Sequence, residues 1–140
     1  MFVVAATTHE SVEQVWTRLT DFAAHAQGVP LTTTRTDPDP PTEGWTFTPR
    51  TSLGPLGFDD PMVVTVWEPP TRFRVEKTGR VLAGWADVTL DQLRRGGTRV
   101  TWTEEVVPAH ATLARLTRPL FDAAGRLVFG RALRRMLAGS

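Results

Sequence analysis

The stretch 111-ATLARLTRPLFDAAGRLVFGRALRRML-137 decides how we expect this chain to fold. Its apolar residues recur at steps of three and four, the spacing of one face of an α-helix. This apolar stripe consists of Leu113, Leu116, Leu120, Ala124, Leu127 and Val128. At 1.5 Å per residue the helix reaches about 40 Å, the width of a small domain. A long helix with one apolar face needs an apolar surface to lie on, so we predict that it packs on a sheet formed by the preceding residues.

The residues before this helix alternate apolar and polar side chains with the period of two that is typical of β-strands. Short turns join the predicted strands, which favours an antiparallel meander over a parallel sheet. The predicted strands are 3–8, 31–36, 44–51, 62–68, 72–78, 81–93 and 98–107. After the first strand we predict two short helices: 11–19, with Thr7/Glu10 and Ser11/Gln14 as competing capping boxes, and 21–27, with Asp21 as its cap.

Glycine and proline mark two interruptions in this pattern. Residues 52–61 are rich in both, and we interpret them as a loop, a flexible flap that carries Phe58 as a lid-like aromatic. Pro119 lies inside the predicted final helix, where proline removes a backbone hydrogen bond. We therefore expect a kink there, or a restart of the helix with Thr117 as its cap.

Composition excludes several classes of function. A chain of 140 residues with 41% apolar residues favours one domain over residues 1–140. The formal charge of +1 gives no support to a nucleic-acid partner. The absence of cysteine removes disulfides and thiolate metal sites, and the histidine spacing does not suit a metal, so we predict neither metal nor cofactor. No apolar run reaches the length of a membrane span, and the start lacks the pattern of a secretion signal, so we expect a cytoplasmic location.

Four local phrases accompany the predicted order of strand, two short helices, six strands and long helix. They are VW at 15–16 with LTDF at 19–22, VWEPPTRF at 66–73, GGTRVTW at 96–102, and the loop LGPLGFD at 53–59. Together they resemble the helix-grip (START-like, Bet v 1-like) fold of the START-like or SRPBCC superfamily, in a bacterial branch of polyketide cyclase/dehydrase-type proteins. The superfamily also includes lipid-transfer domains. The resemblance covers essentially the whole chain and implies an α+β fold in which a curved antiparallel sheet of about seven strands wraps around a long C-terminal helix.

The resemblance also implies a cavity between the sheet and the final helix that holds an apolar or aromatic ligand. No catalytic motif is carried over. The candidate ligand-binding residues are Trp45, Phe47, Phe58, Val64, Val66, Phe73, Val88, Trp102, Glu104, Leu120, Ala124 and Val128. We expect Trp16 to pack under the first helix. For Trp45, Phe47, Phe73 and Trp102, two alternatives remain: they fill the core, or they line a pocket with rigid walls.

Glu104 is the most informative single residue. It shares one face of the last strand with Val100, Trp102 and Val106, so the alternation turns it inward. A desolvated carboxyl there would have a raised pKa and could act as a general acid or base, or bind a ligand hydroxyl. The alternative is an ion pair, or a glutamate near the strand end that reaches solvent.

Three functions follow, in order of preference. The first is binding of a hydrophobic small molecule, such as a lipid or polyketide, by a monomer or homodimer. The second is an enzyme of the cyclase/aromatase or dehydratase type, with proton transfer by Glu104 together with Arg50 or His25. The third is a protein-interaction module that uses the sheet or the arginine-rich end of the final helix, where Arg126, Arg131, Arg134 and Arg135 cluster. Fold alone does not choose between binding and catalysis.

Overall fold

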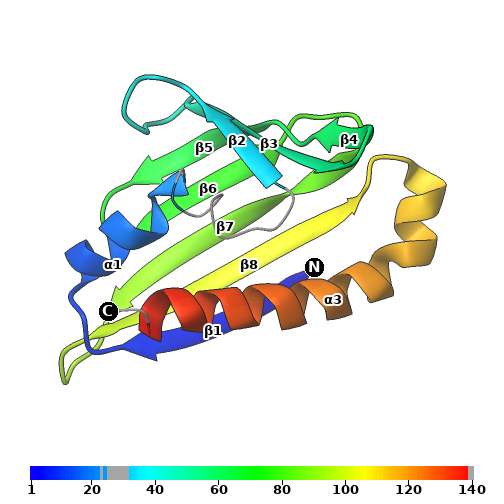
Figure 1. Cartoon of the computed structure of the whole chain (residues 1–140). Helices are drawn as coiled ribbons and strands as arrows, with labels where there is room; N and C mark the ends of the chain where they lie inside the picture. Colours follow the sequence, from blue (N-terminus) through cyan, green and yellow to red (C-terminus); the bar gives the residue numbers. More distant parts are fainter. Residues whose placement is uncertain (23, 25–31, 139–140) are drawn as a thin grey trace.

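The computed structural model describes residues 1–22, 24 and 32–138 (Figure 1). Its helices are α1 (Val12–Leu19) and α3 (Ala111–Ala138). Its strands are β1 (Phe2–Thr8), β2 (Thr32–Thr36), β3 (Thr46–Leu53), β4 (Leu56–Asp59), β5 (Met62–Glu68), β6 (Arg72–Lys77), β7 (Leu82–Gln92) and β8 (Thr98–Pro108). The predicted second short helix lies mostly outside the described residues; within them, Asp21 Oδ1 accepts a hydrogen bond from the Ala24 backbone N–H at 3.1 Å, as a helix cap does.

The strands form one antiparallel sheet in the order β1-β8-β7-β6-β5-β3-β2, with β4 attached to β3. Figure 1 shows α3 lying along β1 and β8, against which it packs. A bulge between Val64 and Val66 and the positive φ of Gly84 interrupt the flat pleat. A Cβ at Gly84 would lie 1.7 Å from the carbonyl oxygen of Glu105 on β8, so β7 approaches its neighbour where only glycine fits. The predicted meander around a terminal helix is confirmed.

Residues 52–61 contain a strand that the sequence pattern did not predict. β4 pairs with the end of β3, with Thr51 opposite Phe58 and Leu53 opposite Leu56, and Gly54 takes a positive φ at the tip. The prediction of a loop was therefore wrong: this segment is a tight β-hairpin. Gly54 and Pro55 form the turn, whereas Gly57 lies within β4.

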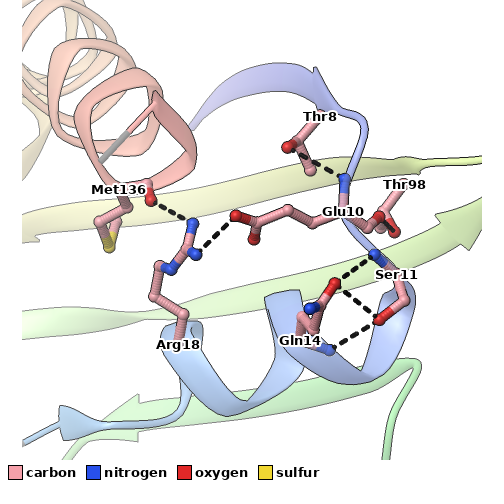
Figure 2. A network of polar contacts seen from close by, with 7 residues as sticks. All are labelled: Thr8, Glu10, Ser11, Gln14, Arg18, Thr98 and Met136. Atoms are coloured by element: carbon pink, nitrogen blue, oxygen red, sulfur yellow. Dashed lines mark hydrogen bonds and ion pairs between the residues drawn. The ribbon is translucent and has the colours of Figure 1, made fainter. Parts of the chain in front are cut away.

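The start of α1 settles which capping box forms. The Ser11 hydroxyl accepts a hydrogen bond from the Gln14 backbone N–H at 3.2 Å, and the Gln14 side chain accepts one from the Ser11 backbone N–H at 3.1 Å. Both bonds appear in Figure 2. The competing box fails because Glu10 turns toward Arg18, whose guanidinium donates to Glu10 Oε1 at 2.7 Å.

Arg18 also joins α1 to the end of the chain. Its guanidinium donates to the Met136 carbonyl oxygen at 2.9 Å, in the last turn of α3 (Figure 2). The backbone carbonyl of Glu10 in turn accepts from the Thr98 hydroxyl at 2.9 Å, at the start of β8. One polar network thus connects α1, β8 and α3, and it satisfies a carbonyl that the helix end leaves without an internal partner.

The core between α1 and the sheet is aromatic. Trp16 is buried, as predicted, and its ring lies 4.9 Å from Trp67 and 5.7 Å from Phe73, measured between centroids. Phe22 continues this cluster, with centroid distances of 5.6 Å to Phe73 and 4.9 Å to Phe47. These edge-to-face and stacked contacts fill the space beneath α1.

α3 faces the sheet with a different set of residues from the predicted one. Phe129 stacks on Phe2 with the ring centroids 5.7 Å apart, and Gly125 lies against the same Phe2 ring. The residues of α3 that are buried are Ala114, Gly130, Leu133 and Leu137. The predicted apolar stripe is exposed: Leu113, Leu116, Leu120, Leu127 and Val128 all face solvent. The predicted orientation of the helix is therefore wrong, because α3 carries two apolar stripes and the one with glycine and phenylalanine makes the closer contact.

Pro119 lies inside α3, and Figure 1 shows the first turns of the helix at an angle to the remainder. The predicted kink is confirmed. Thr117 does not cap a new helix, because its hydroxyl donates back to the Leu113 carbonyl oxygen at 2.5 Å. Among the described residues, no helix is both long enough and apolar enough to cross a membrane.

Candidate ligand-binding cavity

A cavity of about 420 Å³ lies between the sheet and α3. This volume falls within the range of small-molecule sites. The residues that line it come from β2, β3, β5 to β8 and α3, together with Phe22 and Asp60. They are Phe22, Thr32, Thr34, Phe47, Pro49, Thr51, Asp60, Met62, Phe73, Val75, Lys77, Leu82, Ala86, Trp102, Glu104, Val106 and Phe129.

Five aromatic side chains form rigid walls: Phe22, Phe47, Phe73, Trp102 and Phe129. Phe22 stacks on Phe47 with an interplanar angle of 13°, and Trp102 lies 5.8 Å from Phe129 between ring centroids. Each ring is held by a neighbouring ring, so the walls keep their shape without a ligand. Flat apolar walls of this kind suit a ligand that is itself flat and apolar.

Three ionisable side chains interrupt the apolar lining: Asp60, Lys77 and Glu104. The register explains how the strands bring two of them together. Glu104 on β8 is opposite Ala86 on β7, which is opposite Val75 on β6, so Lys77 lies two residues farther along the same face. Lys77 Nζ donates to Asp60 Oδ2 at 2.5 Å, and both side chains are largely buried.

Glu104 is only 6% exposed. Burial raises the pKa of its carboxyl to about 7, while the nearby Lys77 ammonium and the Trp102 indole oppose that rise. Within the described part of the chain, Glu104 Oε2 has no hydrogen-bond partner, and neither do Asp60 Oδ1 and Thr34 Oγ1. The cavity therefore combines apolar walls with polar atoms that a ligand can engage.

Several solved structures share this architecture with the chain. The Polyketide_cyc-like protein Cgl2372 from Corynebacterium glutamicum superposes with a TM-score of 0.69 at 17% identity, over 98% of this chain and 88% of that one. Protein CV1439 from Chromobacterium violaceum gives 0.69 at 13% identity, over 98% and 94%. The di-domain ARO/CYC StfQ from the steffimycin biosynthetic pathway gives 0.66 at 12% identity, over 99% of this chain and 51% of that one.

The chain has the START-like helix-grip fold. Neither a protein-family model nor a curated protein matches its sequence. At these identities the structural neighbours establish the fold, and the chemistry has to be argued from the cavity itself.

Four of the twelve candidate residues line the cavity of this helix-grip fold: Phe47, Phe73, Trp102 and Glu104. Trp45, Val64 and Val88 are buried in the core, and Phe58 and Val66 are half-buried on β4 and β5, outside the lining. Leu120, Ala124 and Val128 are exposed on α3. Ala124 and Val128 instead border a smaller cavity of about 220 Å³ beside Phe2. Contact of these eight residues with the ligand stays a prediction that the geometry does not favour.

The two other residues considered for proton transfer do not join the site. Arg50 pairs with Asp59 at 3.1 Å and does not line the cavity, and His25 lies outside the described residues. In the described ranges, no three or more histidine, aspartate or glutamate residues come together as a metal site would require.

Sequence reasoning missed Lys77 and Asp60, the ion pair inside the cavity. One signal was present: Lys77 is the only lysine in a chain with sixteen basic residues. The compact ammonium group of lysine pairs differently from a guanidinium, so a single lysine among arginines was a residue to examine. Phe129, the α3 residue that faces the cavity, was missed because the wrong apolar stripe was assigned to the sheet.

Proposed function

We propose that this protein binds a hydrophobic small molecule with a flat ring system in the cavity between the sheet and α3. The observation that carries the proposal is a preformed cavity of about 420 Å³ with five aromatic walls. Cavities of this size and composition bury most of a small ligand and need few polar groups to orient it.

The polar atoms narrow the chemistry of the ligand. Lys77 and Asp60 neutralise each other, so they give a charged ligand no net attraction. The unpaired carboxyl oxygens of Glu104 and Asp60 instead suit a neutral ligand that carries hydroxyl groups at one end. A ligand that leaves them unpaired forfeits binding energy, so an unsubstituted hydrocarbon should bind more weakly than its hydroxylated analogue.

The test is native mass spectrometry and fluorescence titration with naphthalene, naphthol, anthraquinone and a fatty acid. Ala86 faces the cavity and Ala83 lies on the same strand with the opposite parity, so Ala86→Leu should weaken binding while Ala83→Leu should not. The proposal fails if no compound binds, or if both substitutions leave binding unchanged.

Glu104 supports a second candidate function, an enzyme of the cyclase/aromatase or dehydratase type. A carboxyl with a pKa of about 7 is matched to proton transfer at neutral pH. In such a step the Glu104 carboxylate takes a proton from a carbon beside a ligand carbonyl, and Lys77 donates a hydrogen bond to the oxygen where negative charge develops.

The experiment for this second function follows conversion of linear poly-β-ketone substrates by mass spectrometry. Glu104→Gln keeps the shape of the side chain and removes the base, so turnover should fall by about a hundredfold while ligand binding persists. Unchanged turnover in this variant would exclude Glu104 as the proton carrier. Turnover absent from the wild type, with binding present, would leave ligand binding as the function.

A further inference from the structure

The solvent side of α3 carries an apolar stripe that the fold does not use. Leu113, Leu116, Leu120 and Leu127 are all at least half exposed, and Leu116 and Leu120 reach 73% and 70%. At 3.6 residues per turn these four leucines fall within an arc of about 60°. Exposed leucines scattered singly are ordinary, but an aligned row on one helix marks a contact surface.

Positive charge is concentrated on the same helix. α3 contains six arginines and one aspartate, whereas the rest of the chain has ten basic and fourteen acidic residues. Arg131 and Arg134 continue the arc of the leucines toward the C-terminus. Arg118 approaches Glu105 at 3.5 Å; the other five arginines form no ion pair with any described residue. Arg135 lies beside them, whereas Arg115, Arg118 and Arg126 project about 80° or more away from the arc. We name the four leucines together with Arg131, Arg134 and Arg135 the leucine–arginine surface.

Charge decides between the possible occupants of this surface. Two copies of α3 packed through this surface would bring two sets of three arginines together, and like charges in close contact oppose association. The headgroups of an anionic bilayer supply the opposite charge, and the acyl layer just below them accepts leucine side chains. A helix with leucines beside unpaired arginines fits that layered arrangement.

We propose that the leucine–arginine surface docks the protein on an anionic lipid membrane, with α3 lying in the plane of the interface. The leucines enter the boundary between headgroups and acyl chains, and the arginines bind lipid phosphates. Docking is peripheral, since α3 contains too many charges to span the bilayer. This inference is independent of what the cavity binds.

The test is co-sedimentation with vesicles of phosphatidylcholine alone and of phosphatidylcholine mixed with phosphatidylglycerol. We expect binding to the mixed vesicles that weakens with salt, and little binding to neutral ones. Arg131→Gln with Arg134→Gln should weaken binding by about fivefold for each arginine. Leu116→Gln with Leu120→Gln should weaken it by about tenfold for each leucine, and glutamine preserves helix propensity.

Two matched controls separate this surface from general effects. Arg94→Gln with Arg95→Gln removes the same charge from the exposed turn between β7 and β8, and Val81→Gln replaces an exposed apolar residue outside α3. Both should bind like the wild type. Equal losses in the controls, or no binding to anionic vesicles, would overturn the proposal. A wild-type dimer in light scattering that Leu116→Gln and Leu120→Gln convert to a monomer would also overturn it, because a second copy would then cover the surface.

Discussion

The Arg18 guanidinium donates a hydrogen bond to the Met136 carbonyl oxygen at 2.9 Å and holds the end of α3 against α1. The same guanidinium pairs with Glu10 at 2.7 Å, so a single side chain joins the two helices across 118 residues of sequence. α3 forms one wall of the cavity, and its position there depends on what fixes its two ends.

Replacing Arg18 tests this attachment. Arg18→Met keeps most of the apolar stem but leaves Glu10 and the Met136 carbonyl without this donor, so we expect a loss of about 2 kcal/mol in the free energy of unfolding. Urea denaturation measures it. Arg115 is an exposed arginine of α3 that forms no ion pair with the described residues. Arg115→Met is therefore the control and should change stability by less than about 0.5 kcal/mol. Equal effects of the two substitutions would show that Arg18 does not hold the helix.

The Lys77–Asp60 ion pair is buried, so removing one partner should destabilise the protein more than removing both. Lys77→Met leaves the Asp60 carboxylate without its cation and should cost about 3 kcal/mol of stability. The double variant Lys77→Met with Asp60→Asn removes both charges and should recover most of that loss. Thermal and urea unfolding of the wild type, both single variants and the double variant gives the interaction free energy between the two residues. If the double variant is no more stable than Lys77→Met, the pair is not the source of the loss.

Much of the fold could be predicted from the sequence, because the strand and helix periods are local properties. The alternation that turned Glu104 inward is confirmed, because this side chain is only 6% exposed and lines the cavity. The orientation of α3 was not accessible in this way. Two stripes satisfied the helical period, and the choice between them depended on Gly125 approaching the Phe2 ring, a contact between residues far apart in sequence.

The candidate site was predictable only in part, for a related reason. Strand parity placed Trp102 and Glu104 on the inward face of the last strand, and the resemblance made Phe47 and Phe73 pocket candidates; all four line the cavity. Strand parity separates inward-facing from outward-facing residues, but it does not distinguish those that line the cavity from those that pack in the core. Val64 and Val88 also face inward, but they are buried in the packed core, outside the cavity lining.

Glu104 should make stability depend on pH. Its pKa is raised from 4.5 to about 7 in the folded state, so between these values the folded protein binds a proton that the unfolded chain has lost. Stability from this group is therefore fully present below about pH 4.5 and declines as pH rises toward 7, by about 3 kcal/mol in total.

Urea unfolding of the wild type and of Glu104→Gln from below pH 4.5 to above pH 7 measures this contribution, because that range includes both pKa values. All other titrating groups are shared, so the difference between the two curves isolates Glu104. We expect the variant to gain stability relative to the wild type as pH rises to 7. Parallel curves would mean that Glu104 is not desolvated in solution.

Two glycines of α3 provide the sharpest test of how the helix lies on the sheet. A Cβ at Gly125 would meet the buried Phe2 ring at 2.3 Å, whereas a Cβ at Gly130 would have its nearest neighbour at 3.5 Å. Gly125→Ala should therefore destabilise the protein by about 2 kcal/mol through overpacking. Gly130→Ala should stabilise it by about 0.5 to 1 kcal/mol, because alanine favours the helix and meets no clash. Thermal unfolding compares the two, and a stabilising effect at both positions would mean that the Phe2 face of α3 does not contact the sheet.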